Sequence, residues 1–143
     1  MADNQAVDTK LGLDITEWKT GVAEINRSVR VLESDFKAVA AGMDDWKTSA
    51  DGLALRNDTL TQQIDKQKQK VALLEAEYQR MKDAAEANGD TSDKTRASLE
   101  QFQIKLNSAR EQLAKNETEL RKNSNALDDM NSAIPGLNKE ISV

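Results

Sequence analysis

The apolar side chains of this chain recur with a seven-residue period, and this pattern restricts what the chain can fold into. When Ile15 is counted as position a of the repeat, 28 of the 35 a and d positions between residues 15 and 134 are apolar. Apolar residues make up only 38% of the chain, so composition alone does not produce this enrichment. A sustained seven-residue repeat places an apolar stripe on one helix face and is typical of coiled coils.

The positions beside the stripe help to choose between two helical architectures. The e and g positions are mostly Lys, Glu, Ser, Gln and Arg, whereas helices that cover a globular core usually carry a wider apolar face. We therefore predict elongated coiled-coil helices rather than a globular bundle, with the stripe as a protein-interaction seam. The principal seam residues are Ile15, Trp18, Val22, Ile25, Val29, Leu32, Phe36, Trp46, Leu60, Ile64, Leu74, Tyr78, Leu99, Phe102, Leu106, Leu113 and Leu120.

Two short segments interrupt helix formation and divide the repeat into three parts. Residues 48–52 and 88–93 combine glycine with Ser, Thr, Asp or Asn, which are residues that end one helix and cap the next. The sequence therefore predicts an all-α chain whose helices cover residues 15–47, 49–88 and 93–134.

The second interruption allows the chain to fold back on itself. Folding about residue 90 places Leu74 opposite Leu106, so we predict a helical hairpin over residues 53–130. The register is also unbroken across residue 90, so a continuous helix is the alternative. We expect a homo-oligomer, but the residues at a and d do not specify the number of chains.

The two ends of the chain depart from the repeat. Val7, Leu11 and Leu13 share one face at strand spacing, which predicts a short N-terminal strand or a flexible arm over residues 1–14. Pro135 is expected to end the third helix and to leave residues 135–143 as a tail. This tail carries no closing element, so we expect it to be truncated from a longer chain.

The composition argues against catalysis. The chain has no cysteine and no histidine, which removes thiolate chemistry and the commonest general base near neutral pH. Asp44 and Asp45 are adjacent, so on a helix they point about 100° apart and cannot clamp one ion. The glycines are isolated and form no phosphate-binding loop. We expect no catalytic residue, no cofactor, no metal site and no enzymatic activity.

The charge distribution also limits the partners. The net charge is −5 with acidic and basic residues intermixed, whereas nucleic-acid binding normally needs a positive surface. No apolar run approaches the roughly 20 residues of a membrane span. We therefore expect neither sequence-specific nucleic-acid binding nor membrane contact from this segment.

The first part of the chain resembles the N-terminal region of phage tail tape measure proteins. The segments around residues 36–46 and 49–53 are the most specific part of the likeness. The matching order of elements is KLGLD (10–14), TEWKTGVAEIN (16–26), LESDFKA (32–38), AGMDDW (41–46), SADGL (49–53) and a lysine- and glutamine-rich helix over 62–78.

The resemblance implies a structural protein of the virion. Such a protein is made in the host cytoplasm, occupies the lumen of the tail tube and sets the tube length during assembly. Its implied partners are tail tube proteins and tail assembly chaperones. Tape measure proteins usually run to many hundreds of residues and carry membrane-active segments further on, so the resemblance implies an N-terminal fragment.

A second function class remains open at the level of sequence. Trp18 and Trp46 both occupy d positions, where they either pack in the seam or anchor another protein, because tryptophan is enriched at binding hot spots. The alternative function is therefore a coiled-coil adaptor or an assembly-chaperone-binding protein.

Overall fold

The computed structural model describes the backbone of residues 2–142 and the side chains of residues 17–132. Three long helices form nearly all of this backbone, and it contains no strand. Helix α1 spans Ala2–Ala40, α2 spans Ala50–Ala87 and α3 spans Asp93–Ser142, with a short 3-10 helix, η1, at Trp46–Thr48. The prediction of an all-α chain is confirmed.

The strand predicted near the N-terminus is wrong, because α1 begins at Ala2. In the sequence, Val7, Leu11 and Ile15 follow one another at steps of four residues, a spacing that fits a helix as well as a strand. A helix satisfies its own backbone hydrogen bonds, whereas a lone strand needs a partner that the described backbone does not provide. The side chain of Ile15, the first residue of the predicted seam, lies outside the described side chains.

The first helix ends at Ala40 rather than at residue 47, and a compact turn follows it. The N–H of Gly42 donates to the carbonyl of Val39 at 3.1 Å, which tightens the chain into a turn of i to i+3 type. After η1, the hydroxyl of Ser49 accepts a hydrogen bond from the N–H of Gly52 at 2.9 Å and caps α2. The chain thereby reverses its direction between α1 and α2.

The turn between α2 and α3 lies within residues 88–92. Gly89 has φ of 61°, a left-handed conformation that glycine adopts without steric cost at the end of a helix. The N–H of Asp90 donates to the carbonyl of Ala85 at 2.8 Å and closes the end of α2. The hydroxyl of Ser92 then accepts the N–H of Thr95 at 3.2 Å and caps α3.

The expected end of the third helix at Pro135 is also wrong, since α3 continues to Ser142. Proline lacks an N–H and therefore removes one backbone hydrogen bond from a helix. The backbone is helical on both sides of Pro135, so this proline removes one hydrogen bond without ending the helix.

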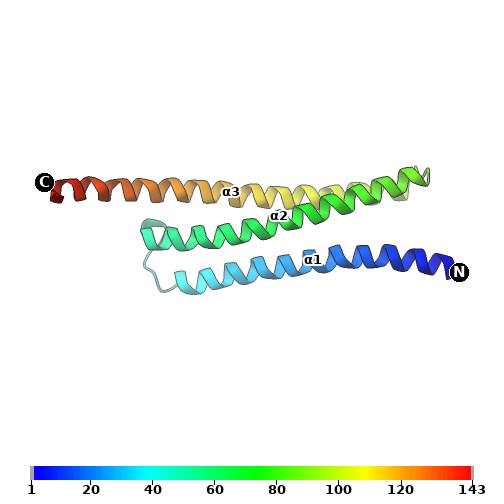
Figure 1. Cartoon of the computed structure of the whole chain (residues 1–143), viewed down its shortest axis with the longest axis horizontal. Helices are drawn as coiled ribbons and strands as arrows, with labels where there is room; N and C mark the ends of the chain where they lie inside the picture. The colour runs from blue at the N-terminus through cyan, green and yellow to red at the C-terminus, as the bar shows by residue number, and fades with distance from the viewer. Residues whose placement is uncertain (1, 143) are drawn as a thin grey trace.

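Helix α2 lies between the other two helices. Figure 1 shows α1 and α3 along opposite sides of α2, with each helix antiparallel to its neighbour in the chain, and α2 packs against both. The core cluster contains Leu74, Phe102, Leu106 and Ala109, and the side chains packed around it are Trp18, Val22, Val71, Tyr78 and Met81. All three helices therefore contribute side chains to this cluster.

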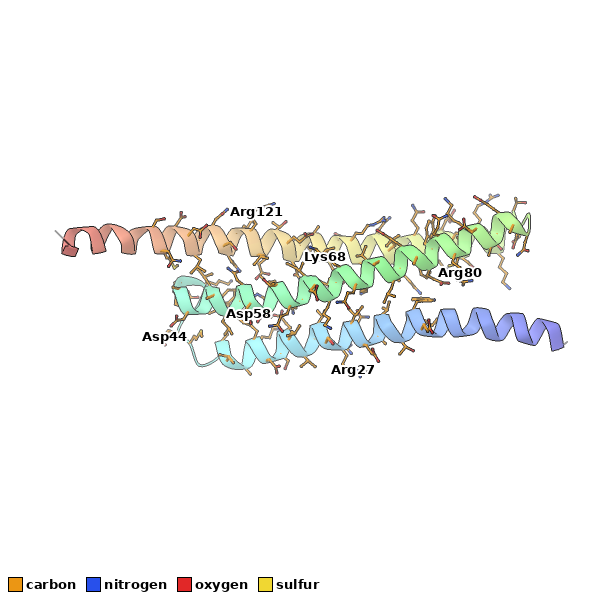
Figure 2. The ribbon with its side chains drawn as sticks, viewed as in Figure 1. Arg27, Asp44, Asp58, Lys68, Arg80 and Arg121 are labelled. Atoms are coloured by element: carbon orange, nitrogen blue, oxygen red, sulfur yellow. The ribbon has the colours of Figure 1, made fainter. Side chains whose placement is uncertain are left out.

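The contacts favour a three-helix bundle over the extended coiled coil predicted from the sequence. The polar e and g positions led to that prediction. In the structure, α2 uses two faces, and polar side chains carry much of its contact with α1 (Figure 2). A polar face can be an internal face when its groups are hydrogen bonded.

Candidate functional site

The predicted seam residues whose side chains are described all lie wholly or partly out of solvent. The buried ones are Ile25, Phe36, Leu60, Ile64, Leu74, Phe102 and Leu106. The partly buried ones are Trp18, Val22, Val29, Leu32, Trp46, Tyr78, Leu99, Leu113 and Leu120.

The seam residues do not form one continuous contact. Trp18 of α1 meets Phe102 of α3 edge to face, with ring centroids 5.1 Å apart, and Tyr78 stacks on the same Phe102 ring at 6.5 Å. Phe36 and Trp46 form a separate edge-to-face pair at 5.0 Å beside the α1–α2 turn. Both tryptophan side chains therefore contact other rings of the same chain, and each remains partly exposed to solvent.

Sequence reasoning missed a second face of α2, which packs toward α1. We call it the polar face; its members recur at c and g positions with alternating steps of three and four residues. Its buried members are Gly52, Arg56, Thr59, Gln63 and Glu77, and Lys66, Lys70 and Leu73 are partly buried. The sequence signal for this face is the second seven-residue repeat. It contains almost no apolar residue, so a search for apolar periodicity does not identify it as a buried face.

Arg56 connects the polar face to both neighbouring helices. Its Nη1 donates to Glu33 of α1 at 2.8 Å, and its Nε donates to Glu119 of α3 at 2.6 Å. The guanidinium also lies over the ring of Phe36, 4.8 Å from the ring centroid. One side chain of the central helix thus joins all three helices through charge-assisted hydrogen bonds.

Two further residues of the polar face reach α1. The amide nitrogen of Gln63 donates to the backbone carbonyl of Val29 at 3.1 Å and to Glu33 at 3.2 Å. Further along the same face, the Nζ of Lys70 donates a hydrogen bond to Oδ1 of Asn26 at 2.8 Å. These bonds are specific in distance and direction, so they fix the register of α1 on α2.

A glycine permits close contact at the far end of this interface. A Cβ atom added to Gly21 of α1 would lie 2.9 Å from Cδ1 of Leu73 on α2. Such a Cβ atom would meet only the end of a flexible side chain, so Leu73 would have to shift slightly to admit it.

Burial and hydrogen bonding act in opposite directions on the central ion pairs. Burial disfavours the charge of Glu33, but hydrogen bonds from Arg56 and Gln63 and the charges of Arg56 and Lys37 outweigh it and lower the pKa. Burial likewise opposes the charge of Arg56, but Glu119 and Glu33 outweigh it and raise the pKa. Both groups are therefore held in their charged forms.

The interface has the chemistry of a structural junction. Among the described residues, no group of three or more His, Cys, Asp or Glu side chains is placed to hold a metal ion. No described helix is long and apolar enough to cross a membrane. The described side chains hold the helices in register through Arg56, Gln63 and Lys70.

The chain was compared with protein-family models, with curated proteins and with solved structures, and none of the three comparisons gave a match.

Proposed function

We propose that this chain is a structural assembly element, the N-terminal segment of a phage tail tape measure protein. In this proposal it occupies the lumen of the tail tube in the virion and contributes to setting the length of the tube. Tail tube proteins and tail assembly chaperones are its proposed partners. The proposal rests on the sequence resemblance, and the structure supplies a physical role for the residues that carry it.

The observation that supports the proposal best is the corner between α1 and α2. The two most specific segments of the resemblance, residues 36–46 and 49–53, contain Phe36 and Trp46, whose rings are in contact, and Ser49, which caps α2. Gly52 lies so close to the backbone of Trp46 that a Cβ atom at this position would lie 2.5 Å from the Trp46 Cα. The segments thus share one structural task, which is to reverse the chain.

We further propose that residues 53–130 act as a helical hairpin with a coiled-coil seam within the assembled tail. Antiparallel pairing is supported by a hydrogen bond of 2.9 Å from Asn116 to Gln67 and by an ion pair of 2.9 Å from Arg110 to Glu75. Chain that doubles back adds nothing to the distance between its two ends. Only those parts of the parent protein that do not fold back on themselves then add to the tail length in proportion to their number of residues.

Tail lengths in a phage that encodes the parent protein test this function. Removing one heptad from a continuous helical part should shorten the tail by about 10 Å, because a helix rises about 1.5 Å per residue. Removing one heptad from each of α2 and α3 should leave the length nearly unchanged, whereas a continuous helix would shorten by about 21 Å. Electron microscopy of the tails measures both.

The second candidate function is an adaptor that binds another protein through its helices. The exposed apolar side chain of Ile104, with 67% of its surface accessible, favours this candidate. Unchanged tail length after heptad deletions throughout the parent protein would overturn the tape measure function and leave the adaptor.

A further inference from the structure

A groove runs along α2 between α1 and α3. It consists of two adjoining hollows that share Asn26 and Lys70. Lys70 and Leu74 of α2 contribute to its lining, together with Trp18 and Arg30 of α1 and Ile104 and Lys105 of α3. The groove exists because α1 and α3 each pack chiefly on α2 and little on one another.

The groove is positively charged although the chain is acidic. Its lining includes the cations Arg30, Lys70 and Lys105 and no carboxylate, whereas the whole chain has a net charge of −5. Among the described side chains, none of these three cations lies within ion-pair distance of a carboxylate. The two adjoining hollows therefore carry three positive charges, and no described carboxylate forms an ion pair with any of them.

Lys70 is the most strongly confined of these cations. It is partly buried, and its ammonium group donates to the neutral amide of Asn26 at 2.8 Å. Burial lowers its pKa, which shows that removal from water disfavours its charge. A carboxylate brought into the groove would relieve this cost.

The same groove offers apolar surface. Ile104 has 67% of its surface exposed, the largest value among the large apolar side chains described as exposed. Trp18 also lines the groove, and its indole ring is only partly covered by Phe102. A ligand that fits the groove must therefore combine an apolar stripe with negative charge.

We propose that the groove binds an amphipathic helix of another protein, with an apolar stripe flanked by Asp or Glu. Helices pack about 8–10 Å apart, and a fourth helix laid over α2 would complete a four-helix bundle. Its apolar side chains would cover Ile104 and Trp18, and its carboxylates would pair with Lys70, Arg30 and Lys105. The inference stands independently of the tape measure function.

Synthetic peptides test the charge and the apolar requirement separately. The probe is a peptide of about 28 residues, four heptads, with Leu at a and d and Glu at e and g; repulsion between the Glu flanks keeps it from pairing with itself. One matched peptide carries Lys in place of Glu, and another carries Ser in place of Leu. The Trp46→Phe chain leaves Trp18 as the only tryptophan, so its fluorescence reports binding at the groove.

The expected result is a one-to-one complex with the Glu peptide that alters Trp18 fluorescence, with affinity at least about tenfold weaker for either matched peptide. Lys70→Gln and Ile104→Ser should each weaken binding several-fold, while Lys68→Gln, on the exposed surface of α2 and labelled in Figure 2, should not. Ile104 is so exposed that its replacement leaves the fold intact, which circular dichroism verifies.

Several results would overturn the proposal. These are no binding of the Glu peptide, equal binding of the Glu and Lys peptides, or equal losses from Lys70→Gln and Lys68→Gln. If the chain alone forms a dimer and Ile104→Ser abolishes that dimer, the occupant of the groove is a second copy of the chain. Salt-sensitive binding of a short single-stranded oligonucleotide that displaces the Glu peptide would make the groove a phosphate-binding surface instead.

Discussion

Arg56 of the central helix lies 2.8 Å from the carboxylate of Glu33, so one ion pair ties α2 to α1 close to the turn that joins them. The same guanidinium lies 2.6 Å from Glu119 of α3, and only 10% of the Arg56 side chain is exposed. Among the described side chains, no other cation forms an ion pair with Glu33 or Glu119, so removal of this arginine would leave both carboxylates without one. Arg56 therefore pairs with both outer helices at this junction, while Gln63 and Lys70 bond to α1 at further points.

Replacement of Arg56 by alanine should destabilise the chain by about 2 kcal/mol. Breaking a buried ion pair usually costs more, but Glu33 and Glu119 are 32% and 36% exposed, so water lessens the cost here. Urea unfolding followed by circular dichroism measures the difference. The control is Arg96→Ala, whose exposed pair with Asp93 at 3.9 Å should cost less than about 0.5 kcal/mol. Equal effects of the two substitutions would contradict the role of Arg56.

Stability should fall in acid partly through Glu33. The folded-state pKa of Glu33 is lowered, so its contribution is complete above the pKa of an unfolded glutamate, about 4.3, and is lost as pH falls through the lower folded pKa. Glu33→Gln removes this term, so its unfolding free energy should depend less on pH below about 4.3 than that of the natural chain. Titration of unfolding against pH for the two chains makes the comparison. Parallel curves would show that the pKa of Glu33 is the same in both states.

The apolar core should respond far more strongly than the surface to truncation. Leu74 and Leu106 are 2% and 3% exposed and belong to one cluster, so either change to alanine should cost about 2–5 kcal/mol. Lys68 is exposed, and Lys68→Ala should cost less than about 0.5 kcal/mol. Chemical denaturation of the three variants tests the heptad register. Similar losses at core and surface would mean that the register is wrong.

The two glycines at the α1–α2 interface should differ in their tolerance of alanine. A Cβ atom at Gly52 would press on the backbone of Trp46, which cannot move without opening the corner, so Gly52→Ala should cost about 1–3 kcal/mol. A Cβ atom at Gly21 meets only the flexible end of Leu73, and the better helix propensity of alanine offsets this contact by about 1 kcal/mol. Gly21→Ala should therefore be nearly neutral. Thermal unfolding that ranks Gly21→Ala as the more damaging change would contradict this account.

The all-α class was predictable because the apolar repeat is long and regular. Leu74, Phe102 and Leu106 stand out in such a pattern and lie in the core, since apolar periodicity directly marks the helix face that leaves water. The break at Gly89 was also visible, because a left-handed residue at a helix end is usually glycine.

The polar face could not be found in the same way. Arg56, Gln63 and Lys70 resemble solvated residues in sequence, and they become internal only because α1 folds back over α2 and supplies Glu33, the Val29 carbonyl and Asn26. Their partners are 23 to 44 residues away, so no local pattern connects them. The same tertiary packing explains why a narrow apolar stripe was insufficient to distinguish a coiled coil from a bundle.

The distance between residues 68 and 115 tests the folded-back arrangement most directly. The chain has no cysteine, so Lys68→Cys and Lys115→Cys place spin labels at two exposed sites and nowhere else. Their neighbours Gln67 and Asn116 are hydrogen bonded at 2.9 Å. Pulsed electron paramagnetic resonance measures the distance between the two labels. Dilution of the labelled chain in unlabelled chain ensures that the measured distance lies within one molecule. We predict a distance below about 35 Å, since packed helix axes lie about 10 Å apart and the labels add their own length. A distance near 70 Å, which a continuous helix would give over this span, would contradict the account.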